Sequence, residues 1–247
     1  MPDVYYLKEK VAASCRVLAR AGCMRECTGH VSARIEGTDT ILIRGRADNE
    51  TGLLFTTSRD IVMIDLKGNL LEKGVDLRPP SETPLHTAIY SARPDVVSVV
   101  HGHPTYTAVM SAMDKPLMPV CGGYHFQATA MAADGIPVCE RTVLIDNEER
   151  AQDMLKAMKG ANVVLLKGHG LAAAGKSIES AASITIATEH LARMNFLANL
   201  LGKPRSVPQE ELDDFVKPKP DGGKPWAARS VFRFYEDLIN QRIEKEI

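Results

Sequence analysis

Two short apolar runs, each followed by histidine, constrain the fold of this chain most strongly. Val96–Val100 is rich in β-branched residues, is too short for a helix and leads into His101-Gly102-His103. Val163–Leu166 is a second run of this kind, and Gly168-His169-Gly170 follows it. Such runs are typical of buried strands. We therefore expect two buried strands that carry histidines at their ends.

The apolar periodicity predicts the elements around these two runs. Val4–Ala21 has apolar residues three and four positions apart and is followed by Gly22, which predicts an amphipathic helix. Short β-rich runs separated by turn residues predict an antiparallel meander over Val31–Ile35, Thr40–Arg44, Leu53–Thr57 and Ile61–Asp65. Further helices are expected over Pro79–Arg93 with Ser81 as N-cap, up to Met113, over Glu148–Met158 and over Ile178–Leu200.

The length of 247 residues suffices for one large α/β domain. Pro204–Pro225 contains five of the fourteen prolines and a Gly222-Gly223 pair, which predicts an extended arm before a last helical segment at Val231–Ile243. Too little chain follows the arm to form a second core. We expect one domain over residues 1–203, with the arm and helix of residues 204–247 packed on it or on a neighbouring subunit.

Charge and cysteine content exclude several classes of protein. There are 30 Lys and Arg against 31 Asp and Glu, without a Lys/Arg-dense run, which argues against nucleic-acid binding. No run of 18 apolar residues and no apolar stretch of signal-peptide length near the N-terminus occur, so membrane spanning and export are not expected. Five cysteines without a Cys-x-x-Cys pair indicate reduced thiols and a cytoplasmic protein.

The histidines could hold a metal ion. His101 and His103 are two apart in a strand, so their side chains project to the same side with Cα atoms about 6.5 to 7 Å apart. The pair alone suits solvated or hydrogen-bonded histidines equally well. His169 between two glycines, and Glu82 near a helix start, favour a divalent ion with a position open for substrate. Glu82 could instead only stabilise that helix terminus.

Six short motifs lie in order along the chain. They are Gly29-His30-Val31-Ser32-Ala33-Arg34, Phe55-Thr56-Thr57-Ser58, Pro80-Ser81-Glu82 with His86 four residues on, Arg93-Pro94-Asp95-Val96, Val100-His101-Gly102-His103-Pro104 and Leu166-Lys167-Gly168-His169-Gly170-Leu171. In this order and spacing, over about residues 5–200, they resemble the class II aldolase/adducin family. The resemblance implies an α/β fold with three α/β/α layers and a mostly antiparallel central sheet, in a homotetramer with active sites near subunit interfaces.

The resemblance also implies the roles of the site residues. His101, His103 and His169 would bind one divalent metal ion per subunit, which could be Zn, Mn, Co or Fe. Glu82 would be the general acid and base. A neighbouring subunit could complete the site with His125 or Tyr235, although these fit a loop and a core position as well. We keep His86 as a buried, hydrogen-bonded partner and His190 as structural.

The chain departs from the sugar-phosphate members of the family where these bind phosphate. Those members have Gly-Asn, Thr-Pro-Ser-Gly and Ser-Ser, whereas this chain has Gly29-His30, Thr57-Ser58-Arg59 and Pro80-Ser81. An imidazole and a guanidinium suit a planar carboxylate at least as well as a phosphate. We therefore expect His30 at the catalytic site and substrate contacts from Arg59, Ser81, Thr57 and Tyr235, with Arg44 and Arg46 as weaker candidates.

Two further segments resemble the family's decarboxylase branch, whose members remove a carboxyl group ortho to a hydroxyl on an aromatic or heteroaromatic acid. They are Ile43–Thr57 and Phe232-Arg233-Phe234-Tyr235. The function that we expect is a metal-dependent carbon–carbon lyase, a decarboxylase of a small anionic substrate that works through an enolate-like intermediate. The alternatives are an aldolase or epimerase of a sugar or sugar phosphate, and a non-catalytic assembly protein like adducin.

Overall fold

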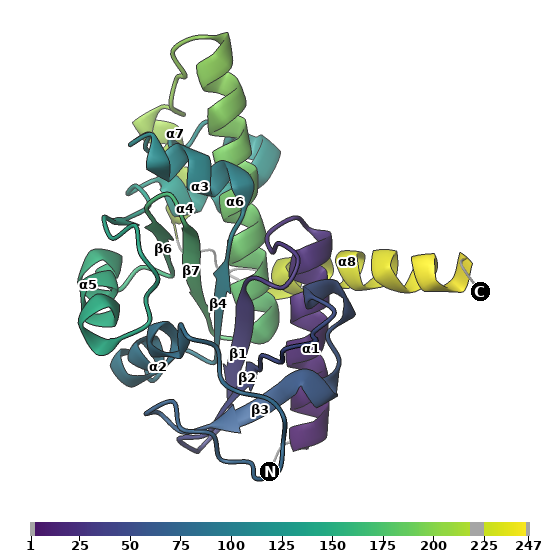
Figure 1. Cartoon of the computed structure of the whole chain (residues 1–247). Helices are drawn as coiled ribbons and strands as arrows, with labels where there is room; N and C mark the ends of the chain where they lie inside the picture. Colours follow the sequence, from purple (N-terminus) through teal and green to yellow (C-terminus); the bar gives the residue numbers. More distant parts are fainter. Residues whose placement is uncertain (1–2, 218–224, 246–247) are drawn as a thin grey trace.

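The computed structural model describes residues 3–217 and 225–245 and has three layers (Figure 1). The central sheet consists of β1 (His30–Arg34), β2 (Ile41–Arg44), β3 (Ile61–Ile64), β4 (Ser98–Gly102), β5 (Val138–Cys139), β6 (Val163–Leu166) and β7 (Gly170–Gly175). Their order across the sheet is β3-β2-β1-β4-β7-β6-β5. Every neighbouring pair is antiparallel except β5 and β6, which are parallel. The predicted α/β class with a mostly antiparallel sheet is confirmed.

Helices bury both faces of the sheet. The helices α1 (Val4–Arg20) and α6 (Ile178–Leu201) cover one face, and α2 (Thr83–Ala92) and α5 (Glu148–Met158) cover the other. Alternate side chains of a strand therefore belong to different apolar clusters: Leu42 packs on the α1 side, whereas Ile41 and Ile43 pack on the α2 side. By the same alternation, the histidine side of β4 faces α2, since Val99 belongs to that cluster.

The remaining helices are short or lie outside these two layers. They are α3 (Thr105–Ala112), α4 (Phe126–Ala132), α7 (Gln209–Val216), α8 (Pro225–Lys245) and three turns of 3₁₀ helix, η1 (Leu53–Phe55), η2 (Ser58–Asp60) and η3 (Gly122–His125). α8 lies against α1 and α6, where Phe232 is buried, and its C-terminal half projects from the rest of the chain (Figure 1).

Three local predictions are wrong. The segment Leu53–Thr57 is not a strand, because a hydrogen bond from Phe55 N–H to the carbonyl of Gly52 (3.2 Å) closes a 3₁₀ turn there. Pro204–Pro225 is not extended throughout, because α7 forms within it and buries Leu212. Ser81 is not the N-cap of α2: Glu82 takes that position, without a cap bond from its side chain.

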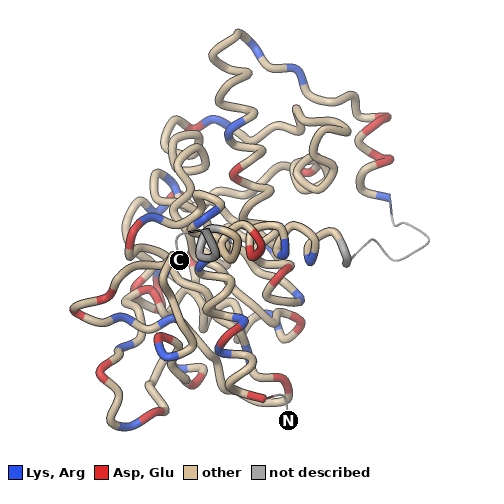
Figure 2. Tube along the Cα trace, turned by 90° about the vertical axis from the view of Figure 1, so that its right-hand side faces the viewer, with Lys and Arg blue, Asp and Glu red and all other residues tan. Residues whose placement is uncertain are grey.

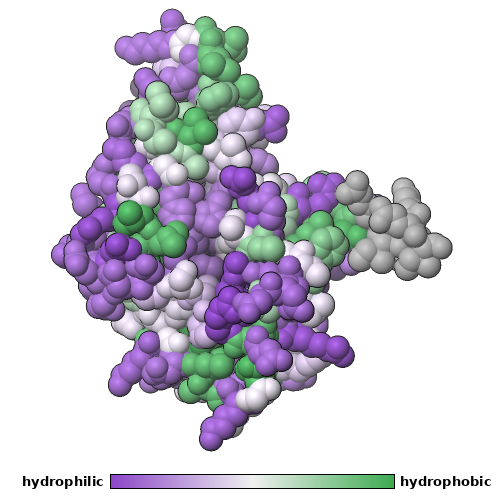
Figure 3. Space-filling view, viewed as in Figure 1, coloured by the Kyte–Doolittle hydropathy of each residue, from purple (hydrophilic) through white to green (hydrophobic). Residues whose placement is uncertain are grey.

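The surface of the described chain carries charges of both signs. Lys and Arg are interspersed with Asp and Glu along the trace in Figure 2. None of the described helices combines the length and the apolar character that crossing a bilayer requires. All five cysteines are unpaired, as the sequence predicts. Exposed apolar side chains occur in and just after α3 (Val109 and Met113) and near the end of α6 (Leu197, Leu200 and Leu201). Figure 3 shows apolar surface at the top of the molecule, where α6 ends in Figure 1.

Candidate active site

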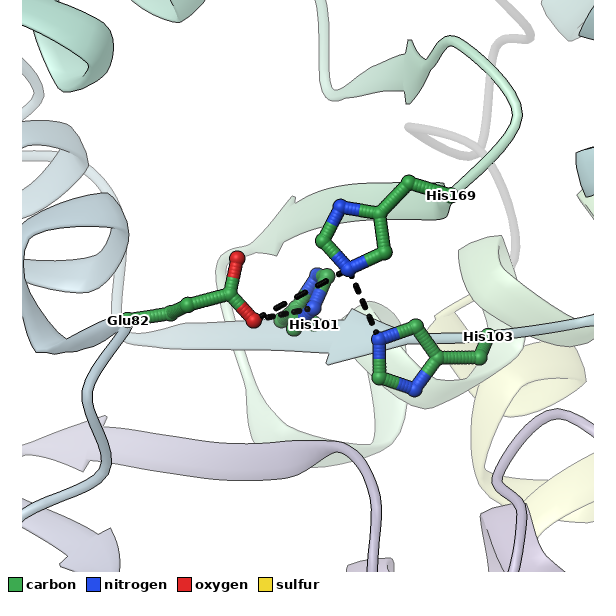
Figure 4. Close-up of side chains that lie close together, drawn as sticks. All are labelled: Glu82, His101, His103 and His169. Carbon is green, nitrogen blue, oxygen red and sulfur yellow. Dashed lines mark hydrogen bonds and ion pairs between the residues drawn. The ribbon is translucent and has the colours of Figure 1, made fainter. Parts of the chain in front are cut away.

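Four side chains from separate parts of the chain converge at one end of the sheet (Figure 4). Glu82 immediately precedes α2, His101 lies in β4, His103 follows β4, and His169 lies in the turn between β6 and β7. The Nε2 atoms of His103 and His169 are 3.0 Å apart. Oε2 of Glu82 lies 3.1 Å from Nε2 of His101 and 3.8 Å from Nε2 of His169. The structure thus brings together the three predicted metal ligands and the predicted general acid and base.

This donor set fits a divalent metal ion. One potential ligand atom of each residue lies within 4.8 Å of all the others. A tetrahedral ion with metal–nitrogen bonds of 2.0 to 2.1 Å separates its ligand atoms by roughly 3.3 Å, close to the distances found here. Nε2 of His101 is buried without a hydrogen-bond partner, although Oε2 of Glu82 lies 3.1 Å away. A buried nitrogen with a free lone pair is what a metal ion requires.

The proton positions also suit a metal ion. Nδ1 of His101 can donate to the carbonyl of Leu171 (3.0 Å), which leaves the lone pair on Nε2. Burial and the other histidines lower the pKa of His103 to about 3 and also lower the pKa of His169. Both imidazoles are therefore neutral at pH 7, as metal ligands must be.

Glu82 stays ionised in spite of its burial. Burial alone would raise the pKa of this carboxyl group, but the His101 imidazole, the Ile145 N–H and His169 outweigh that effect and lower the pKa to about 2. The Ile145 N–H donates to Oε1 at 2.9 Å. Oε2 is therefore left to face the histidines, and the cluster combines one negative carboxylate with three imidazoles.

Glycines allow the histidine-bearing segments to approach each other closely. A Cβ atom on Gly102 would lie 2.7 Å from the carbonyl oxygen of Cys23, and one on Gly170 would lie 2.1 Å from the carbonyl oxygen of Gly102. Any side chain at Gly170 would push β7 away from β4. These two glycines thus set the distance between His169 and His103.

His30 lies directly beside the cluster, although it does not line the cavity in front of it. That cavity has a volume of about 680 Å³ and is lined by His103 and His169, among others. In the sheet, His30 pairs with His101, and their ring centroids are 5.0 Å apart. Burial and neighbouring positive groups, including Arg46, keep the pKa of His30 well below its usual range. His30 is therefore a neutral imidazole next to the cluster.

Most of the predicted substrate contacts do not lie at the cluster within one chain. Arg59 lines a second cavity together with Asp48 and Asp76, and that cavity contains none of the four cluster residues. Thr57 binds Asp60 through its backbone N–H (2.7 Å) and its hydroxyl (3.0 Å). Ser81 is exposed and precedes Glu82 in the chain. Tyr235 is half-buried on α8, and the ring of His125 contacts that of His190.

Arg46, unlike Arg59, is a charge that acts on His30. Both Arg44 and Arg46 form ion pairs with Glu50, the second at 2.7 Å. Two guanidinium groups thus share one carboxylate, which leaves an uncompensated positive charge. The charge of Arg46 contributes to the low pKa of His30, so this excess acts on the imidazole next to the histidine cluster.

Sequence reasoning missed the residues that hold the site in place. Ile145 anchors Glu82, and Tyr90 belongs to a hydrogen-bonded group with Ser32 and His86. A spacing signal existed for Tyr90, since Glu82, His86 and Tyr90 are four residues apart and so share one helix face. Nothing in the local pattern distinguishes Ile145 from other buried apolar residues.

Comparisons with known proteins agree with this geometry. Residues 9–196 match the family described as Class II Aldolase and Adducin N-terminal domain. The 3,4-dihydroxyphthalate decarboxylase of Arthrobacter keyseri is 35% identical over 230 residues, which is 92% of this chain and 91% of that protein. The enzyme of the same name from Terrabacter sp. (strain DBF63) is 36% identical over 83% of this chain and 87% of its own length. These relatives support a carboxy-lyase.

Sugar-phosphate aldolases are more distant relatives. The L-fuculose phosphate aldolase of Escherichia coli O6:H1 is 28% identical over 83% of this chain and 89% of that protein. Among solved structures, an aldolase II superfamily protein from Pseudomonas syringae superposes with a TM-score of 0.81, at 22% identity over 96% of this chain and 95% of that one. An L-fuculose 1-phosphate aldolase gives a TM-score of 0.73, at 26% identity over 85% and 94% of the two chains.

Proposed function

Because this chain belongs to the class II aldolase and adducin family, we propose that it decarboxylates an aromatic or heteroaromatic dicarboxylic acid of the 3,4-dihydroxyphthalate class, with the help of one bound divalent ion. The observation that carries the proposal is the convergence of Glu82 and three imidazoles, within reach of an excess of positive charge. The first feature is suited to a metal ion, and the second to a carboxylate.

The metal ion would be held by His101, His103 and His169, with Glu82 next to it. Nitrogen and oxygen donors of this kind accept Zn²⁺, Mn²⁺, Co²⁺ and Fe²⁺, so availability decides among them. When bound, the ion supplies Lewis acidity, which stabilises the negative charge that develops as CO₂ leaves.

Glu82 would move the proton that the reaction requires. The bond between the ring carbon and the carboxyl carbon breaks, its electrons pass to the ring, and CO₂ departs. The ring carbon then needs a proton. Oε2 of Glu82 faces the cluster and is ionised, so it can accept the proton of the ortho hydroxyl group and return it to that carbon. The bond from Ile145 to Oε1 keeps Oε2 turned toward the substrate.

Arg46 and His30 would bind a substrate carboxylate. A guanidinium group pairs with a carboxylate through two parallel hydrogen bonds. Arg46 has charge to spare because Glu50 is shared with Arg44, and it is close to His30. We assign the role predicted for Arg59 to Arg46, and retain Ser81, Thr57, Tyr235 and His125 as contacts that a homotetramer would have to complete across a subunit interface.

The deciding experiment compares carboxylic acids with a ketose phosphate. Purified protein loaded with Mn²⁺, Co²⁺ or Zn²⁺ should release CO₂ from 3,4-dihydroxyphthalate or another ortho-hydroxy aromatic acid, and should leave L-fuculose 1-phosphate intact. The opposite result would establish the aldolase alternative, which the distant relatives keep as the second candidate. If the protein consumes neither the acid nor the ketose phosphate, both enzymatic functions are contradicted.

A matched pair of variants tests the carboxylate contact. Arg46→Ala should raise KM for the acid by about tenfold, because a hydrogen-bonded charge pair typically contributes about 1.5 to 3 kcal/mol. Arg59→Ala removes the same side chain at the second cavity and should leave KM unchanged. If Arg59→Ala has the larger effect, the original assignment to Arg59 is correct.

A further inference from the structure

A hydrogen-bonded chain of four buried side chains, His30, His86, Ser32 and Tyr90, lies behind the histidine cluster, between β1 and α2. Nδ1 of His30 is 2.7 Å from Nε2 of His86, and Nδ1 of His86 is 2.7 Å from the hydroxyl oxygen of Ser32. That oxygen is 2.9 Å from the hydroxyl of Tyr90 and 3.5 Å from the carbonyl of Val99. All four side chains are buried, with at most 4% of each residue exposed. The chain therefore connects the cluster to the interior through short hydrogen bonds.

The groups in this chain have a fixed number of protons. Burial, with a smaller contribution from His101 and against the opposing charge of Glu82, lowers the pKa of His86 to about 3, so this imidazole is neutral. Burial raises the pKa of Tyr90, which keeps its hydroxyl proton. A neutral imidazole donates through one nitrogen and accepts through the other. The protons can therefore be ordered in one of two directions, or His86 and Tyr90 can both donate to Ser32, whose hydroxyl then donates to the carbonyl of Val99 at 3.5 Å.

The distances favour one of these directions. In the first, Tyr90 donates to Ser32 (2.9 Å), Ser32 donates to Nδ1 of His86 (2.7 Å), and Nε2–H of His86 donates to Nδ1 of His30 (2.7 Å). In the reverse direction, Ser32 donates to Tyr90, and the Tyr90 hydroxyl is left with the carbonyl of Val97 at 3.4 Å. Hydroxyl donors normally bind at 2.5 to 3.0 Å, so only the first direction uses normal bonds throughout.

We propose that His86, Ser32 and Tyr90 are positioning residues that fix the tautomer of His30 with its proton on Nε2. Nε2 of His30 has no hydrogen-bond partner in the described part of the chain. With its proton in place, Nε2 is a donor that can bind a carboxylate oxygen, whereas the other tautomer would present a lone pair and repel it. The proximity of the Arg46 charge also favours an anionic oxygen at this position. The identity of the acceptor rests on the proposed function, but the tautomer does not.

The tautomer can be measured directly by nitrogen NMR of protein labelled with ¹⁵N-histidine and loaded with Zn²⁺. In the wild type, His30 should have a protonated Nε2 and an unprotonated Nδ1, and the signals are assigned by their loss in His30→Asn and His86→Asn. Ser32→Ala removes the donor to His86, so both His86 and His30 should show mixed tautomers. Ser32→Thr keeps the hydroxyl group and should restore the wild-type pattern.

Ser98→Ala is the matched control. Ser98 is equally buried in the adjacent strand, and its hydroxyl donates to the backbone carbonyl of Ser32 at 2.7 Å. Its side chain makes no bond with the side chains of His30, His86, Ser32 or Tyr90 in the described part of the protein. This variant should keep the tautomer of His30. In kinetic assays, Ser32→Ala should raise KM for the acid by about tenfold with little change in kcat, as expected when binding alone is weakened.

Two NMR results would overturn the proposal: a proton on Nδ1 of His30 in the wild type, or the same tautomers in Ser32→Ala as in the wild type. Because the NMR measurement requires no substrate, a protein with the expected tautomer that releases no CO₂ contradicts only the proposed function. An unchanged KM in Ser32→Ala with altered tautomers would contradict the assignment of the substrate carboxylate to His30.

Discussion

The two carboxylate oxygens of Glu82 have different partners, and this difference explains how a residue at a helix start can serve a site. An acidic N-cap normally binds the first N–H groups of its own helix. Glu82 makes no such bond. Instead, Oε1 accepts the N–H of Ile145, and Oε2 faces Nε2 of His101 and His169. The N-terminus of α2 therefore lacks the stabilising side-chain cap, and the ionised carboxylate faces the cluster instead.

Glu82→Gln should therefore lower kcat by at least about 100-fold, the lower limit for loss of a general acid or base. The fold should survive, because the amide oxygen can still accept the N–H of Ile145. The measurement is kcat together with metal content and thermal unfolding. Glu189→Gln is the control, since Glu189 is also buried and accepts the N–H groups of Tyr106 and Thr107 at 2.9 Å each. Equal losses of kcat in the two variants would argue against a chemical role for Glu82.

The low pKa of His86 predicts a dependence of stability on pH. Its pKa is about 3 in the folded chain and about 6.5 when unfolded, so between these values the unfolded chain binds one more proton. The free energy of unfolding should therefore fall as the pH is lowered below 6.5. In urea titrations of metal-free protein, the difference between wild type and His86→Gln should shrink by about 1 kcal/mol from pH 7.5 to 5.5. A constant difference would show that His86 is not kept neutral by folding.

At the scale of elements, predictability depends on whether the deciding interactions are local. α5 has the predicted bounds, Glu148–Met158, and the bounds of β6 are also those predicted from its apolar run. β5 has two residues, Val138–Cys139, and forms only because β6 offers a parallel partner, so no pattern within it predicts a strand.

The candidate site shows the same limit. The spacing of His101 and His103 places them on one side of a strand, but their meeting with His169 depends on the turn between β6 and β7. That juxtaposition came from the family resemblance and not from periodicity. Nothing in the local sequence favours Arg46 over Arg59, and only the folded chain shows that the charge of Arg46 acts on His30 while Arg59 lines another cavity.

The close approach of β4 and β7 is an element-scale feature that a single methyl group can test. Gly170→Ala would place a Cβ atom 2.1 Å from the carbonyl oxygen of Gly102. Overpacking of this kind typically costs about 1 to 3 kcal/mol, and displacement of His169 should weaken Zn²⁺ binding by at least about tenfold. Thermal unfolding with chelator and calorimetric Zn²⁺ titration measure the two effects. Gly123→Ala, where a Cβ atom meets nothing within 4 Å, should change neither.

For the whole molecule, the surface divides into a polar majority and one apolar end. Charges of both signs are spread over the trace, whereas the end formed by α3 and α6 exposes Leu200 to 69% and Leu201 to 92%. On soluble proteins, a contiguous exposed apolar patch is typical of an interaction surface. Because some predicted substrate contacts lie away from the cluster in one chain, assembly through this end offers a way to complete the site.

We therefore predict that the protein self-associates through the α3 and α6 end, with a mass that is a multiple of 27.0 kDa and, in the proposed tetramer, four times that value. Leu200→Glu combined with Leu201→Glu should lower the mass measured by sedimentation, because charges would have to be buried at the contact. Leu71→Glu introduces one such charge at a residue that is 48% exposed elsewhere, near β3, and should leave the mass unchanged. An unchanged mass in the double variant would place the interface on another face, and a wild type of 27.0 kDa would rule out self-association and with it a site shared between subunits.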